Sequence, residues 1–129
     1  MNKILVEVSV GELLDKISIL EIKKERIKDS EKLKFINDEH GILKDQLDQN
    51  VKSDNKLNSL FQSLKEINAK LWVIEDDKRL CEKDKDFTEK FIKLSRDVHF
   101  LNDDRANIKL EINNYTGSKI KEVKEYTNY

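Results

Sequence analysis

The chain has 129 residues, of which 40% are charged and 37% hydrophobic, with no proline and three glycines. This length suits one domain, expected over residues 1–129, and the composition favours long solvated helices over a compact β-fold. The formal net charge of −1 gives no overall electrostatic field to attract a nucleic-acid backbone, so we expect no nucleic-acid partner. No stretch approaches the roughly 20 apolar residues of a membrane span, so we expect no membrane partner either.

A short strand followed by two helices is predicted for the first half of the chain. Ile4–Val8 is rich in β-branched residues, which favour a strand. Ser9 ends this strand and, with Glu12 three residues later, forms a capping box that begins a helix reaching about residue 28. A second helix should follow, and 50–55 is the best candidate for the loop after it.

Two long amphipathic helices are predicted next, over about 57–82 and 87–115. Their seam residues recur at steps of three and four, the period of helices packed in a coiled coil. The seams comprise Leu57, Leu60, Leu64, Ile67, Leu71, Ile74, Lys78 and Cys81 on the first, and Phe91, Leu94, Val98, Leu101, Arg105, Ile108, Ile112 and Tyr115 on the second. The short connection between them predicts an antiparallel hairpin.

We therefore expect a mainly α fold: a helical bundle with a long antiparallel hairpin and short terminal strands. The second strand is expected over 118–126, because the N-terminal strand needs a pairing partner. The seams and second apolar faces exceed what one small core can bury, which predicts a homo-oligomer, with a dimer favoured. The single Cys81 cannot form an internal disulfide, and we expect a cytoplasmic protein.

One seam position, Arg105, carries a guanidinium that is costly to remove from water without a partner. Either a carboxylate on a neighbouring helix or a ligand should therefore contact it. Other charged or polar side chains lie near the seams and could share a pocket with it. The candidate ligand-binding residues are Trp72, Glu75, Arg79, Asn102, Asp103, Arg105 and Lys109, and secondary candidates are Glu12, Asp15, Glu21 and Lys24.

Two functions fit this pattern. In the leading interpretation the chain is a non-catalytic interaction or assembly module, its charged stripes fix partner register, and Arg105→Leu is neutral or stabilising. In the alternative it is a binding protein or Mg²⁺-dependent enzyme for a nucleotide or sugar phosphate. Arg79, Arg105 and Lys109 then hold the anion, while Glu75 and Asp103 hold the metal or act as acid and base.

Catalysis is the less favoured interpretation, because the standard enzyme motifs are absent from the sequence. No catalytic residue can be assigned on this basis. His40 and His99 stand apart from each other and from Cys81, without the spacing of metal ligands. We therefore predict no resident metal or cofactor, with Mg²⁺ entering only under the alternative.

Three blocks carry a resemblance to known sequences: S-V-G-E-L-L-D-K-I-S-I-L-E-I-K at 9–23, A-K-L-W-V-I-E-D-D-K-R at 69–79 and N-D-D-R-A-N-I-K-L-E-I-N at 102–113. They resemble a small family of uncharacterised proteins of bacteria, particularly marine ones, and their phages. The resemblance implies no catalytic residues and at most a role around carbohydrate assembly. A phage-encoded member would act in the host cytoplasm.

A thinner resemblance is to all-α nucleotide pyrophosphohydrolases, which use E-x-x-D and E-x-x-E pairs to hold Mg²⁺ against phosphates. Glu12 and Asp15 stand at that spacing, and the resemblance implies a metal pair there. The sequence departs from that family in its helix order, in Lys16 beside the pair and in the absence of an E-E-x-x-E block. These departures put the metal pair in doubt.

Overall fold

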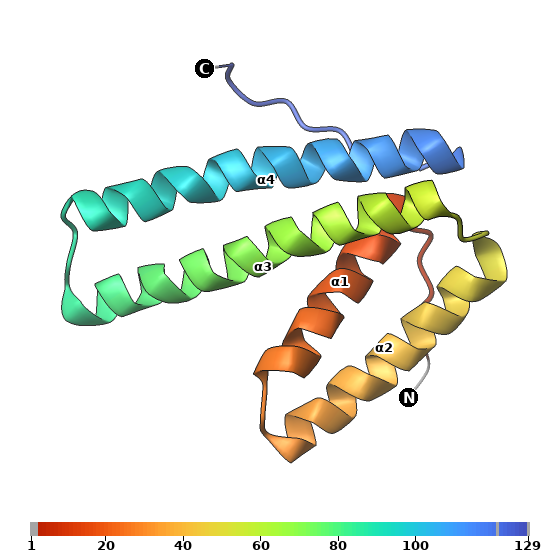
Figure 1. Cartoon of the computed structure of the whole chain (residues 1–129), viewed down its shortest axis with the longest axis horizontal. Helices are drawn as coiled ribbons and strands as arrows, with labels where there is room; N and C mark the ends of the chain where they lie inside the picture. The colour runs from red at the N-terminus through yellow and green to blue at the C-terminus, as the bar shows by residue number, and fades with distance from the viewer. Residues whose placement is uncertain (1–2, 121, 129) are drawn as a thin grey trace.

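The computed structural model describes residues 3–120 and 122–128, which contain four α-helices. These are α1 Val10–Arg26, α2 Ser30–Asn50, α3 Asn55–Asp84 and α4 Glu89–Thr116. The predicted mainly α fold is confirmed, and α3 and α4 form the long antiparallel hairpin (Figure 1). No helix among the described residues has the length and apolar character needed to cross a membrane.

Local capping groups fix where the helices begin and end. Ser9 Oγ accepts a 3.0 Å hydrogen bond from the backbone N–H of Glu12, and the side chain of Asp54 accepts one of 2.8 Å from Leu57. These bonds satisfy amides that the first turn of a helix leaves without partners. At the end of α4, Gly117 has φ 69°, a left-handed conformation that glycine adopts without a Cβ clash.

The predicted terminal strands are wrong: residues 3–8 and the described part of 118–126 form no strand, and residue 121 lies outside the described chain. The two segments come close only at the start of α1, where the backbone N–H of Val10 lies 3.3 Å from Ser118 Oγ; from there they diverge, and the C-terminal segment runs along α4 (Figure 1). A side-chain ion pair between Glu122 and Lys109, at 3.1 Å, takes the place of a strand ladder.

The core lies where α1 crosses the hairpin. Helix α1 packs against all three other helices, and Leu14 meets Leu57, Leu64 and Ile112 in the central apolar cluster. The crossing occupies only one end of the hairpin, so α3 and α4 extend well beyond α1 and α2 (Figure 1). We call residues 55–72 and 102–116 the proximal half of the hairpin, and 73–84 and 89–101 its distal half.

Burial differs sharply between these halves although the seam runs through both. The fully buried residues of the proximal half are Leu57, Leu64, Asn68, Leu71, Lys109, Ile112 and Asn113. Among the described residues of the distal half, Cys81 is the one fully buried side chain. Val73, Leu80, Ile92 and Phe100 are between 41% and 55% exposed there. The distal half thus has the sequence of a packed helix pair without further helices to pack on.

Candidate functional site

The seam guanidinium of Arg105 is met by a carboxylate of the same chain. Asp15, on α1, is 1% exposed and accepts a 2.9 Å hydrogen bond from Arg105 Nε, while Arg105 Nη2 donates to its second oxygen. This bidentate geometry is the strongest that an arginine makes with a carboxylate. The hydrogen bond to Asp15 raises the pKa of Arg105, so the guanidinium stays charged.

Two uncharged side chains complete the environment of Asp15. Asn68 Nδ2, on α3, lies 2.8 Å from both Asp15 Oδ1 and Ser18 Oγ, and Ser18 Oγ donates to the backbone carbonyl of Asp15 at 2.8 Å. No buried side-chain nitrogen or oxygen in the described part of the chain lacks a partner. The cluster therefore joins α1 to both helices of the hairpin, and its buried polar side-chain atoms find their partners within the chain.

Lys109 is held in a second carboxylate cluster one turn further along α4. Its Nζ lies 2.7 Å from Glu12, 3.1 Å from Glu122 and 3.9 Å from Asp15. Burial opposes the charged form, but the hydrogen bonds to Glu12 and Glu122 outweigh it, so the pKa of Lys109 is raised. Lys124 and Lys109 in turn lower the pKa of Glu122. This network fastens the C-terminal segment to α4.

The start of α1 is closed by α4 and the segment after it. The backbone N–H of Gly11 donates to Asn113 Oδ1 at 2.7 Å, and that of Val10 donates to Ser118 Oγ at 3.3 Å. A Cβ on Gly11 would lie 2.6 Å from the carbonyl oxygen of Lys109, too close for any side chain. Gly11 thus permits a close approach between helices, and no anion is needed to explain it.

Sequence reasoning missed the role of Asn113 and Ser118 at this contact. The available signal was Gly11, a glycine inside the first turn of a capped helix. Such a glycine indicates that another part of the chain approaches the helix closely, but it does not identify that part. Asn68, the partner of Asp15 on α3, is also absent from the candidate residues that the sequence pattern singles out. Its partner lies 53 positions away in the chain, so no local spacing identifies it.

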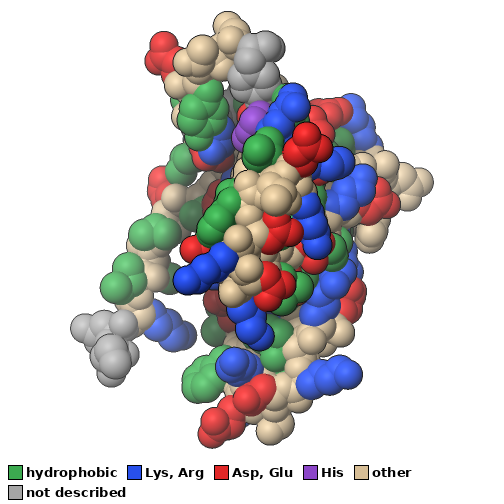
Figure 2. Space-filling view, turned by 90° about the vertical axis from the view of Figure 1, so that its left-hand side faces the viewer, with side chains coloured by type: hydrophobic (Ala, Val, Ile, Leu, Met, Phe, Trp, Pro, Cys, Tyr) green, Lys and Arg blue, Asp and Glu red, His purple; other side chains and the backbone are tan. Residues whose placement is uncertain are grey.

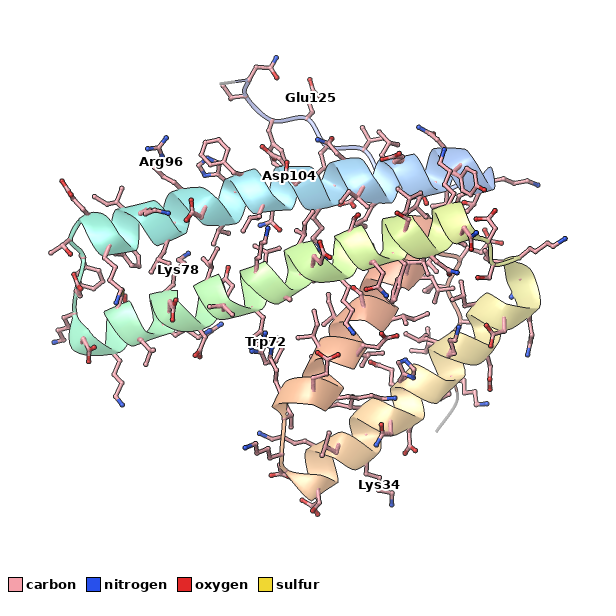
Figure 3. All side chains as sticks on the ribbon, in the orientation of Figure 1. Lys34, Trp72, Lys78, Arg96, Asp104 and Glu125 are labelled. Atoms are coloured by element: carbon pink, nitrogen blue, oxygen red, sulfur yellow. The ribbon has the colours of Figure 1, made fainter. Side chains whose placement is uncertain are left out.

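Beside the cluster, a cavity of about 420 Å³ opens where α1 diverges from α3 and α4. Ile19 and Ile22 of α1 form part of its apolar lining. The structure brings five of the seven candidate ligand-binding residues to this cavity: Trp72, Glu75, Arg79, Asn102 and Arg105. Figure 3 shows Trp72 pointing into the wedge between α3 and the end of α1. We call this space the wedge cavity.

The charges around the wedge cavity do not favour an anion. Arg105 is neutralised by Asp15, so Arg79 remains as the one cation set against the carboxylates of Glu75 and Asp76. Glu75, Arg79 and Asn102 make no hydrogen bond or ion pair with a described residue, which leaves them available to a ligand. A molecule with an apolar body and charges of both signs would fit this lining better than a phosphate.

The remaining candidates lie elsewhere. Lys109 lines an adjoining polar hollow of about 250 Å³, which shares Asn102 and Arg105 with the wedge cavity, and Asp103 is absent from both linings. Glu21 contacts His40 and Lys65, each at 3.3 Å. Lys24 forms no ion pair with a described residue.

The structure gives no support to the metal pair implied at Glu12 and Asp15. Both carboxylates are engaged by cations, Glu12 by Lys109 and Asp15 by Arg105. Across the described residues, no three His, Cys, Asp or Glu side chains lie together as a metal site. On the side of the molecule seen in Figure 2, which faces the hairpin turn, acidic and basic side chains are interspersed with hydrophobic ones.

Comparison with known proteins places the chain in a family. A family model described as a family of unknown function (DUF6165) matches residues 4–129. No curated protein and no solved structure matches the chain. The expected membership of an uncharacterised family is confirmed, whereas a marine bacterial or phage origin stays a prediction.

Proposed function

For this chain, which belongs to the DUF6165 family of unknown function, we propose a role as a non-catalytic helical interaction module. Its binding surface is the distal half of the α3–α4 hairpin. One observation carries the proposal: the seam continues through the distal half, but among its described side chains there only Cys81 is fully buried, because α1 does not reach this part of the hairpin. A further helical surface packed there would complete the burial that the seam specifies.

The energetics indicate what the partner must supply. Full burial of a Val, Leu, Ile or Phe side chain stabilises by about 1.5–3 kcal/mol, so four half-exposed ones gain about 3–6 kcal/mol. Association costs at least about 4 kcal/mol in lost freedom of motion. The distal half alone therefore supports weak binding at best. A partner that brings a comparable apolar face would make the association stable.

The non-catalytic part of the proposal is supported by the state of the cations. Arg105 and Lys109, which the phosphate alternative needs, are both held by carboxylates of this chain. They join α1 and the C-terminal segment to α4, which is a structural task.

Photo-crosslinking tests the proposal in cells that produce the full chain. A photo-reactive amino acid at Leu80, 50% exposed in the distal half, should give a discrete crosslinked species. The matched control places the photo-reactive amino acid at Ile42 of α2, which is 62% exposed, and should give no discrete crosslinked species. Equal labelling from the two sites, or no discrete species from Leu80, would contradict the proposal.

A second candidate function, small-molecule binding, is favoured by the gathering of predicted residues at the wedge cavity. Its volume of about 420 Å³ falls in the usual range of ligand sites. Thermal unfolding against nucleotides, sugar nucleotides and sugar phosphates, with and without Mg²⁺, tests it. A ligand at a hundred times its Kd adds about 2.7 kcal/mol to the free energy of unfolding.

The matched variant for this test is Arg79→Gln, because Arg79 lines the cavity without belonging to the Asp15–Arg105 pair. A rise in Tm that this variant abolishes would support the second candidate. The absence of a rise with every compound in the panel would count against it.

A further inference from the structure

A shallow apolar groove of about 640 Å³ lies along the hairpin where its two halves meet. Val73 and Ile74 of α3 and Phe100 and Leu101 of α4 form its apolar lining. Its charged residues differ between the two hairpin helices, with Lys70 on α3 and Asp97 on α4, and Arg26 at the end of α1 adds a second cation at its edge. We call this surface the hairpin groove; it is lined by none of the residues of the wedge cavity.

We propose that the hairpin groove receives the same groove of a second copy of this chain, an inference that rests on the proposed function. The two copies are related by a twofold axis that runs along the hairpin. This axis lays α3 of one copy over α4 of the other. The arrangement is isologous, so each contact occurs twice.

The first argument is charge complementarity with itself. Because α3 faces α4 in this arrangement, Lys70 of each copy lies on the side that carries Asp97 of the other. In its own chain Asp97 pairs with Lys93 at 2.9 Å, and 36% of its side chain stays exposed for a second cation. A partner with one sign of charge would meet an unfavourable residue on one of the two helices.

The second argument is the balance of apolar surface. One distal half is too small to support stable association with a polar partner, as its half-exposed side chains show. A second copy contributes an equal apolar face, including Val73 and Phe100, and doubles the surface removed from water. Two hairpins then form a four-helix arrangement in which each seam has helices on its open side.

A charge-exchange experiment tests this arrangement on the full chain by sedimentation velocity. The wild type should show twice the 15.2 kDa mass of one chain. Lys70→Glu places a second carboxylate opposite Asp97 at both contacts, and Asp97→Lys places a second ammonium opposite Lys70 at both. Each variant alone should have its dimer Kd raised at least about tenfold, because like charges in an interface repel.

An equimolar mixture of the two variants is the decisive sample. In the mixed dimer one contact joins the two altered residues and the other joins the two native ones, so both again pair opposite charges. The mixture should therefore dimerise within a few-fold of the wild-type Kd. An effect within one chain cannot produce this recovery, since each chain keeps its own altered residue. The matched control is the pair Lys44→Glu and Asp48→Lys on α2, whose ion pair of 3.2 Å lies outside the groove and whose reversal should leave dimerisation unchanged.

The outcomes separate the two proposals. A mixture that dimerises no better than the single variants would overturn the twofold arrangement. A monomeric wild type together with a crosslink from Leu80 to another protein would overturn self-association and leave the interaction module standing. A monomeric wild type without any Leu80 crosslink would overturn both.

Discussion

Replacing Arg105 by leucine should destabilise the protein, because it leaves the carboxylate of Asp15 without its bidentate partner. Asp15 is 1% exposed, so water cannot solvate its charge. Breaking a buried ion pair from one side typically costs about 3–5 kcal/mol. Two groups soften the loss: Lys109 Nζ lies 3.9 Å from Asp15, and Asn68 still donates at 2.8 Å. We expect the free energy of unfolding to fall by about 2–4 kcal/mol.

The double variant Asp15→Leu/Arg105→Leu should recover most of that loss. Replacing a buried ion pair by apolar side chains is often neutral or stabilising, because no charge remains out of water. Asn68 keeps Ser18 Oγ as an acceptor at 2.8 Å. The double variant should therefore be less destabilised than the sum of the single variants, with an interaction energy of about 2–3 kcal/mol.

Urea denaturation followed by circular dichroism and by Trp72 fluorescence measures these changes at one fixed protein concentration. The slope m should stay constant, so that a shift in midpoint reports stability. Lys44→Leu, which breaks the exposed pair with Asp48 on α2, is the control and should change stability by less than about 1 kcal/mol. An Arg105→Leu variant as stable as the wild type, or a double variant that costs the full sum, would refute the reasoning.

Three further predictions follow from the same structure. Gly11→Ala should lower the free energy of unfolding by about 1–3 kcal/mol in urea, because its Cβ meets the backbone of Lys109; an unchanged midpoint would contradict this contact. The lowered pKa of Glu122 means that its ion pairs contribute fully above the ordinary value of 4.5 and are lost as pH falls through the lowered pKa. An NMR titration of its carboxyl should show this shift, and Lys124→Gln should reduce it. In a dilute solution of the protein, backbone amides of the distal half should exchange hydrogen faster than those of the proximal half. Uniform protection of the two halves would argue against an uncovered hairpin.

Much of the fold is encoded in local patterns that the sequence shows directly. The caps at Ser9 and Asp54 act on amides three residues away, and the three-and-four spacing of the seams needs no distant information. The terminal strands failed for the opposite reason. Strand propensity at Ile4–Val8 is real, but a strand needs a partner, and the two terminal segments diverge beyond the contact of Val10 with Ser118.

The candidate site was predicted in part. Periodicity placed Trp72, Glu75 and Arg79 on one face of a helix, and the structure lines the wedge cavity with all three. It could not predict that α1 would bring Asp15 to Arg105, since that contact depends on the angle at which two helices cross. For the same reason, the expected effect of Arg105→Leu on stability differs: the sequence alone predicts a neutral or stabilising effect, whereas the structure predicts a destabilising one.

Local sequence patterns are enough to specify that this chain forms long capped helices, that two of them pair, and that Arg105 requires a partner. Each of these follows from interactions within a few residues or from the fixed cost of burying a charge. The tertiary structure decided which carboxylate meets Arg105, where the wedge cavity opens and how far α1 covers the hairpin. These depend on packing between residues up to 108 positions apart, where many side-chain contacts together select one arrangement.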